Sequence, residues 1–377
     1  SGAIAPLKGS WLVALRERGG RLARRQDLPP EAFWTADELR RHVDALGPEF
    51  GALFVALSYR WLRPEHPDPV GFHLAIVVDV LQRYLGTAGS ANKDGPNPER
   101  SPLVGAFEGK GLGAPDCAIF WDFASLYQKP RAANEDALFL PGLKASNVWY
   151  GHAASVCWMQ SELPAGFAGV AYEASGWCFV EAAISAGVKP AKQRLDLGKR
   201  TEEALSFAYD HYANIPASKL TGVCAAKRPP PLLPSRVREL LQTEKTFTAS
   251  SDVETVAELY RRFFEGVAST ASRLDFRQLQ WGADEARQLA AVLPRFEALT
   301  ALDLSENKLG AEGGRVIAEG VRVSHSLTEC DLRFNNLGKE GWCAIFDALR
   351  DSPQNTIAKW DLSREWQYSR MDMEIVK

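Results

Sequence analysis

One acidic side chain stands out in an expected helix that is otherwise built from apolar and small residues. The stretch 172–185 reads YEASGWCFVEAAIS, and Glu181 is the only charge in the helix expected at 175–186. A carboxylate with apolar neighbours is either paired inside the protein or faces a cleft, where burial raises its pKa. In a cleft, it can stabilise or attack a carbon that develops positive charge. As a structural group, it would cap a neighbouring backbone, and the sequence leaves both interpretations open.

Polar residues also stand where expected strands end. Residues 53–58 form a buried apolar strand ending at Ser58, and residues 117–121 form a second one followed by Asp122. Further elements are expected as a strand at 155–160 and as helices at 71–85, 134–146 and 175–186. Strands that alternate with helices predict a parallel sheet with helices on both faces. The carboxyl ends of such strands form sites, so Ser58, Asp122 and the loop before Ser175 should meet at one edge.

The C-terminal part of the chain repeats itself. Tripeptides with a central Asp begin at Leu274, Leu302, Cys330 and Trp360, at spacings of 28, 28 and 30 residues. Two copies follow L-x-x-L-x-L-x-x-N-x-L, with Asn307 and Asn335 at the Asn position and expected helices at 311–323 and 339–349. Alternate apolar residues make a short strand, and the Asn satisfies backbone groups where the chain turns away. The pattern resembles leucine-rich repeats of the ribonuclease-inhibitor type, which stack as a solenoid and bind proteins.

The chain divides by composition into four parts. A proline-rich break at 228–234 precedes amphipathic helices expected at 235–241 and 252–268, and residues 87–114 are predicted to be a long surface insertion. We therefore predict an N-terminal extension (1–49), an α/β domain (50–227), a proline-rich and helical connector (228–270) and leucine-rich repeats (271–377).

Composition limits the classes of function. The 377 residues carry a net charge of −3, which argues against nucleic-acid binding because phosphate affinity needs a clustered basic surface. No apolar run reaches the ~20 residues of a membrane helix, so we expect no membrane partner and a cytoplasmic location. The six cysteines form no C-x-x-C pair and no histidines are spaced for zinc, so we expect reduced thiols and no metal.

Short motifs in matching order resemble the Toll/interleukin-1 receptor (TIR) domain and the related fungal heterokaryon-incompatibility (HET) domains. The run S-x-W-C-x-x-E at 175–181 is similar to the TIR motif after the third strand. LSYRW at 57–61, WDFASLYQ at 121–128 and the stretch 148–158 resemble successive HET motifs, and RWLRPEHPDP at 60–69 is similar to algal and protist proteins of this kind. The resemblance covers about residues 50–187 and implies a flavodoxin-like α/β fold, although its usual fourth and fifth strands are not evident after Gly187.

The resemblance implies an activity. Enzymatic TIR domains hydrolyse NAD between nicotinamide and ribose, and the motif Glu is catalytic, so Glu181 takes that role. Nicotinamide is already a cationic leaving group in NAD, and one carboxylate can serve the oxocarbenium-like transition state. Arg60 and Trp61 would hold phosphate and stack on a ring, with Trp177 as a further ring platform. Ser58, Asp122 and Ser125 would contact ribose hydroxyls. NAD is then the substrate, and no cofactor is expected.

Several of these residues have a structural alternative. Arg60 can pair with Glu65 or Asp68, Asp122 can cap the following turn, and Trp177 can belong to the core.

Three functions compete. The first is an NAD glycohydrolase regulated by its repeats in immune or stress signalling; TIR sites are commonly completed between subunits, which implies a homo-oligomer. The second is a non-enzymatic signalling scaffold that binds proteins through both regions. The third is an enzyme related to nucleoside deoxyribosyltransferases, with the same Glu as nucleophile. Fold alone does not choose among them.

Overall fold

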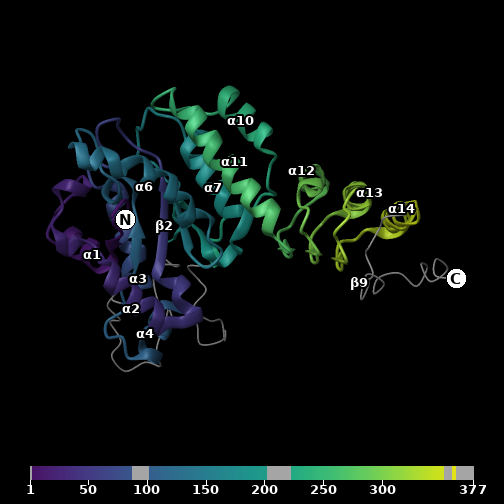
Figure 1. Ribbon diagram of the computed structural model, residues 1–377, viewed down its shortest axis with the longest axis horizontal. Helices are drawn as coiled ribbons and strands as arrows, with labels where there is room; N and C mark the ends of the chain where they lie inside the picture. Colours follow the sequence, from purple (N-terminus) through teal and green to yellow (C-terminus); the bar gives the residue numbers. More distant parts are fainter. Residues whose placement is uncertain (1, 87–101, 202–221, 352–358, 362–377) are drawn as a thin grey trace. The chain divides into compact units, whose positions relative to one another are not determined.

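The computed structural model describes residues 2–86, 102–201, 222–351 and 359–361 (Figure 1). The chain forms two compact units: Ser1–Ala226 with Glu244–Val256, and Lys227–Thr243 with Ala257–Lys377. The boundary at Val256 falls inside one continuous helix, α11 (Asp252–Thr270). None of the helices in the described parts of the chain is long and apolar enough to span a membrane.

The first unit is built on a five-stranded sheet in the order β1-β3-β2-β4-β5. Its strands are β1 (Leu7–Lys8), β2 (Phe54–Tyr59), β3 (Ala118–Phe120), β4 (Val156–Gln160) and β5 (Arg194–Asp196). The last four are parallel, and β1 adds an antiparallel edge to β3. The three strands expected from apolar runs are confirmed. The fourth parallel strand, β5, was not expected, because its three residues RLD carry charges at both ends and lack an apolar run.

The main helices cover both faces of this sheet. They are α3 (Phe72–Tyr84), α6 (Ala133–Gly151) and α7 (Gly176–Val188), all expected from the sequence. The path from β2 to β3 runs one way along the sheet, and the paths from β3 to β4 and β4 to β5 run the other way. Because parallel connections are right-handed, α3 lies on one face and α6 and α7 on the other. Accordingly α6 packs against α7, and α1 (Gly9–Glu17) packs against α3.

Shorter elements complete the first unit. They are α2 (Ala36–Leu46), α4 (Pro102–Lys110), α5 (Asp122–Ser125), η1 (Arg25–Asp27), η2 (Pro30–Ala32), η3 (Gly47–Leu53), η4 (Tyr172–Ala174), η5 (Ala191–Gln193) and η6 (Leu197–Lys199).

Two segments contribute more to the core than their composition indicates. From the N-terminal extension, Leu7 and Leu12 are fully buried, and the Trp34 indole donates to the Cys117 carbonyl at 3.0 Å. In α4, Leu103 and Phe107 are fully buried. The prediction of a surface insertion is therefore wrong for residues 102–110, and its residues 87–101 lie outside the described chain.

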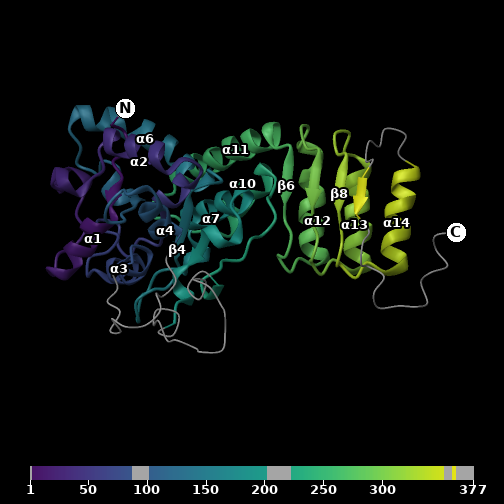
Figure 2. The same cartoon turned by 90° about the horizontal axis from the view of Figure 1, so that it is seen from below.

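The second unit repeats a strand and a helix. Its four parallel strands are β6 (Arg273–Asp275), β7 (Ala301–Asp303), β8 (Glu329–Asp331) and β9 (Lys359–Asp361), in that order. Leu274, Leu302, Cys330 and Trp360 lie in one register, so the repeating tripeptides align in space. The helices α12 (Ala283–Val292), α13 (Gly310–Arg322) and α14 (Gly338–Arg350) lie side by side (Figures 1 and 2). The remaining helices of this unit are α10 (Pro234–Thr243), η7 (Leu293–Arg295) and the greater part of α11; residues 362–377 of the predicted repeats lie outside the described chain.

The repeat asparagines bond the backbone as predicted. The Asn307 amide nitrogen donates to the carbonyls of Phe276 and Leu304 at 2.8 Å each. Its amide oxygen accepts the N–H groups of Leu279 and Trp281 at 3.0 and 3.1 Å. The side chain thus joins one strand–turn unit to the next, and Asn335 repeats the pattern one copy later.

Candidate active site at the carboxyl edge of the sheet

The Glu181 carboxylate meets the end of the central strand β2. Ser58, the second-last residue of that strand, is fully buried and donates from Oγ to Glu181 Oε2 at 2.6 Å. Glu181 itself projects from the middle of α7 and is partly buried. The structure therefore brings together two residues 123 positions apart that the sequence placed at one sheet edge.

The surroundings of Glu181 favour its neutral form. Burial raises the pKa of this carboxyl to about 8, and the nearby charge of Asp122 adds to the effect. Hydrogen bonding to Ser58 and Tyr150 works in the opposite direction. No arginine or lysine pairs with Glu181 among the described residues, so burial without a counter-ion sets its pKa.

Asp122 and Trp61 form a second pair at the same edge. The Trp61 indole donates to Asp122 Oδ2 at 3.0 Å, and the Tyr59 hydroxyl donates to Oδ1 at 2.7 Å. The backbone N–H of Phe123 also donates to Oδ1, at 2.6 Å, so Asp122 bonds the turn after β3 as its structural alternative proposed. Burial raises the pKa of Asp122, and these hydrogen bonds oppose the rise. The site thus contains two carboxyl groups whose pKa values burial has raised.

Arg60 supplies a cation with which no carboxylate of the described residues pairs. Neither expected partner is used: Asp68 instead accepts the backbone N–H groups of His73 and Leu74 at 3.1 and 2.8 Å, and Arg60 has no ion pair within the described ranges. Its Nε is buried without a hydrogen-bond partner. Burial and the charge of Glu181 raise the pKa of the Cys178 thiol, whereas the charge of Arg60 lowers it. Arg60 and Glu181 therefore both lie within electrostatic range of one thiol.

Two buried side chains, those of His73 and Gln160, fix the backbone of Arg60. The His73 ring donates from Nε2 to the Arg60 carbonyl at 2.9 Å, and the Gln160 amide donates to His73 Nδ1 at 3.1 Å. Burial lowers the pKa of His73, so the ring is neutral and this arrangement is kept. Gln160, the last residue of β4, retains a buried Oε1 without a partner. Gln160 could have been found as a polar residue that closes an apolar strand; His73 offers no comparable signal.

The Ser125 side chain bonds the backbone rather than the other predicted site residues. Its hydroxyl is fully buried and accepts the backbone N–H of Trp121 at 3.1 Å. The four-residue helix α5 turns this side chain back under β3. The contact of Ser125 with ribose stays a prediction, and the structure shows its hydroxyl engaged by the backbone.

The Trp177 side chain is engaged by the start of α11. Its indole donates to Asp252 Oδ2 at 2.9 Å. Beside it, the N–H of Gly176 donates to the Thr246 carbonyl at 3.0 Å. Gly176 is required here, because a Cβ would come within 2.0 Å of the Phe247 ring. Trp177 thus anchors the segment before α11, and its indole N–H is not free for a ligand.

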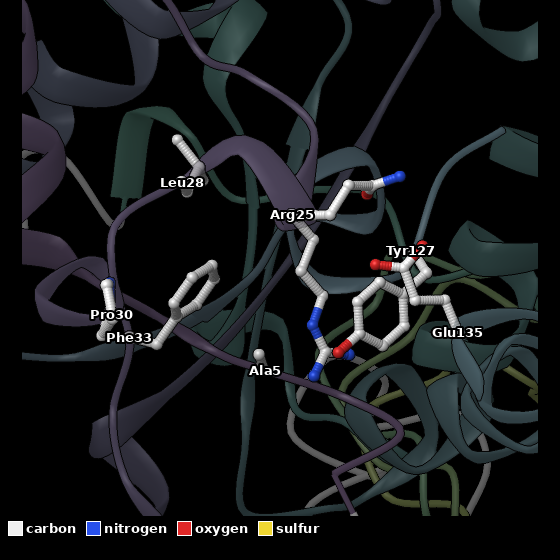
Figure 3. A pocket seen from close by; sticks show the side chains of 8 residues that line it. Ala5, Arg25, Leu28, Pro30, Phe33, Tyr127 and Glu135 are labelled. Atoms are coloured by element: carbon white, nitrogen blue, oxygen red, sulfur yellow. The ribbon is translucent and has the colours of Figure 1, made fainter. Parts of the chain in front are cut away.

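A separate pocket of about 400 Å³ lies in the N-terminal region (Figure 3). Its lining residues are Ala5, Arg25, Gln26, Leu28, Pro30, Phe33, Tyr127 and Glu135. Figure 3 shows Arg25 and Tyr127 side by side, opposite Leu28, Pro30 and Phe33. The Arg25 guanidinium lies 4.0 Å from the Tyr127 ring centre and donates to the carbonyls of Ala3 and Ser125. Arg25 therefore ties backbone segments together, and none of the predicted site residues lines this pocket.

The described parts of the chain contain no cluster of three or more His, Cys, Asp or Glu side chains suited to a metal ion. The chemical groups that the structure brings together at the edge are its carboxyl groups, its hydroxyls and Arg60.

Comparison with known proteins identifies one region. Residues 298–318 and 323–345 match the family model described as Leucine Rich repeat. No curated protein matches the chain. The matched segments contain β7, β8 and most of α13 and α14, so the second unit carries leucine-rich repeats.

Proposed function

We propose that the first unit is an NAD glycohydrolase, with Glu181 as its catalytic carboxylate, and that the repeats regulate it by binding a protein. The observation that carries the proposal is a partly buried carboxyl at the carboxyl edge of a parallel sheet, with which no cation from the described residues pairs and whose pKa is raised to about 8.

The arrangement suits the cleavage of a bond to a cationic leaving group. The C1′–N bond breaks with its electron pair going to nicotinamide, which leaves neutral, while positive charge develops on the ribose carbon. The Glu181 carboxylate stabilises that charge, water adds to the carbon, and the carboxylate takes the proton that water loses. The products are ADP-ribose, nicotinamide and a proton. Because the nicotinamide ring of the substrate is cationic, its binding favours the ionised form of Glu181.

Arg60 would bind the diphosphate of the substrate. A guanidinium at a sheet edge, without an ion pair among the residues that the structure describes, is matched to phosphate oxygens in charge and geometry. Asp122, held by three donors, would orient a ribose hydroxyl, and Trp61 would border the ring.

The fold also supports the proposal. Taken in chain order, the four parallel strands of the sheet are arranged 2-1-3-4, which is the beginning of the flavodoxin-like order 2-1-3-4-5. This strand order is compatible with the fold that the TIR/HET resemblance implies.

The test is nicotinamide release from NAD by the full chain, measured over a range of protein concentrations because TIR sites are commonly shared between subunits. Glu181→Gln should lower the rate at least ~100-fold, and the matched control Glu173→Gln, at an exposed position beside the same helix, should retain it. Release that is equal in the Glu181→Gln and wild-type proteins would overturn the proposal.

The second candidate is a non-enzymatic scaffold, favoured by the leucine-rich repeats, whose extended faces generally bind proteins. It predicts no nicotinamide release at any protein concentration. Release of a free base from deoxynucleosides by the wild type, lost in Glu181→Gln, would instead support the deoxyribosyltransferase-like alternative.

A further inference from the structure

A buried hydroxyl chain ends on the Glu181 carboxylate. Ser58 Oγ lies 2.6 Å from Glu181 Oε2 and 2.6 Å from the Tyr172 hydroxyl. Ser58 is fully buried and Tyr172 is 5% exposed, so protein surrounds both hydroxyls. Tyr172 precedes α7 in the 3-10 helix η4, and Ser58 lies in β2, so three different elements supply the chain.

Proton counting fixes the direction of these hydrogen bonds. A serine hydroxyl has one proton, and an ionised carboxylate can only accept. When Glu181 is ionised, Ser58 donates to Oε2, so the Tyr172 hydroxyl must donate to Ser58 Oγ. When Glu181 is protonated, Ser58 no longer has to donate to it and can donate to Tyr172 instead. The Tyr172 hydroxyl then has no acceptor in Ser58. The chain therefore matches the ionised carboxylate.

We propose that Tyr172 and Ser58 are positioning residues for Glu181: Tyr172 donates to Ser58, and Ser58 in turn fixes Oε2 and with it the plane of the carboxylate that faces the substrate. This rests on the proposed function. It gives Ser58 a different role from the ribose contact expected from the sequence, because its single proton is committed to Glu181.

The chain opposes the effect of burial. Burial alone drives Glu181 toward its neutral form, and the Ser58 hydrogen bond lowers the pKa of the carboxyl. Tyr172 strengthens that bond by polarising the Ser58 hydroxyl. Removal of either hydroxyl therefore leaves the carboxylate harder to ionise and less firmly held.

The direct test is the pKa of Glu181, measured by carbon NMR of the side-chain carboxyl in protein labelled at glutamate, with the signal assigned from its loss in Glu181→Gln. Ser58→Ala should raise this pKa by about 1, the size expected for a hydrogen bond to a charged group. Tyr172→Phe should raise it by about 0.3, because its effect passes through Ser58. Tyr84→Phe is the control for a hydroxyl that bonds a backbone carbonyl, that of Ala52, and should leave the Ser58 chain and the Glu181 pKa unchanged.

A kinetic readout separates positioning from mere folding. In both variants, the midpoint of the pH dependence of kcat/KM for nicotinamide release should move upward with the Glu181 pKa, and kcat should fall more than KM changes. An unchanged Glu181 pKa in both variants would overturn the inference, even if activity fell. If Tyr172→Phe does not fold, the Ser58→Ala titration decides alone. If the wild type releases no nicotinamide, the proposed function fails, and the NMR titration still decides whether the hydroxyl chain controls Glu181.

Discussion

Buried polar groups are treated in opposite ways in the two units of this protein. In the repeats, both ends of the Asn307 amide are satisfied by backbone groups of its own and the preceding repeat. At the edge of the first sheet, Arg60 Nε and Gln160 Oε1 are buried without partners, and Glu181 has a pKa raised to about 8. The same chain thus contains a complete polar network and an incomplete one.

The difference in hydrogen bonding points to different roles for the two sets of buried polar groups. Native proteins satisfy nearly all buried polar groups, so an unsatisfied one needs a reason. In the repeats, the complete hydrogen bonding of the buried Asn side chain rigidifies a stack of strands and helices. At the sheet edge, the unsatisfied donor of Arg60 and the buried carboxyl of Glu181 cost stability, and under the proposed function this cost is offset when they bind a charged substrate.

Asn307→Ala should give the largest effect on stability. The substitution leaves buried backbone N–H and carbonyl groups of two adjacent turns without partners, at a cost on the order of 3 kcal/mol in the free energy of unfolding. Denaturant unfolding, followed by a signal from the repeats, measures it. The control Lys308→Ala, at an exposed neighbouring position, should change stability by less than ~0.5 kcal/mol. A loss as small in Asn307→Ala as in the control would break the comparison.

Glu181→Gln should change how stability depends on pH. In the folded protein the Glu181 pKa is about 8, against 4.5 for an ordinary glutamate, so the folded state holds the proton more tightly. The contribution of this group to stability therefore falls as pH rises from about 4.5 to 8 and stays constant above.

Glu181→Gln removes this loss of stability. Between pH 5 and pH 8.5, the free energy of unfolding of the variant should therefore rise relative to that of the wild type by on the order of 2 kcal/mol, after allowance for partial exposure of the side chain. Thermal unfolding of both proteins across this pH range gives the difference. A difference that is constant with pH would show that the Glu181 pKa is not raised.

Arg60→Gln should give the smallest effect on folding and a clear one on binding. Because Arg60 has no ion pair among the described residues, its loss should leave the unfolding temperature nearly unchanged. Loss of one charged contact to the diphosphate should raise the KM for NAD about tenfold, with a smaller change in kcat. Arg63→Gln, at a nearby exposed arginine, is the control and should behave like the wild type. Equal KM values for the two variants would show that Arg60 does not bind the diphosphate.

Local spacing explains what could be predicted. The positions of Asn307 and the repeat strands follow from a pattern of about 28 residues, because each copy makes the same contacts with its neighbour. Glu181 and Ser58 could be placed at one edge because parallel strands share a direction. The strand β5 could not be predicted, since its Arg194 is buried by pairing with Ser185 and a backbone carbonyl that lie elsewhere in the chain.

Partners far apart in sequence explain what could not be predicted. The Tyr172 hydroxyl reaches Ser58 across 114 residues, and Gln160 reaches His73 across 87, with no local pattern to mark either pair. The orientation of Ser125 has a local reason that the sequence did not reveal: a four-residue helical turn follows β3 and directs its hydroxyl at the Trp121 backbone.

The pH dependence of kcat/KM for nicotinamide release from NAD tests the central claim most directly, because it reports ionisation of the essential groups of the free enzyme. If Glu181 is the catalytic carboxylate, kcat/KM should rise about tenfold per pH unit below pH 8 and level off above it, with its midpoint at the Glu181 pKa of about 8. A rate that is independent of pH between 6 and 9, or a midpoint near the ordinary glutamate value of 4.5, would contradict the account.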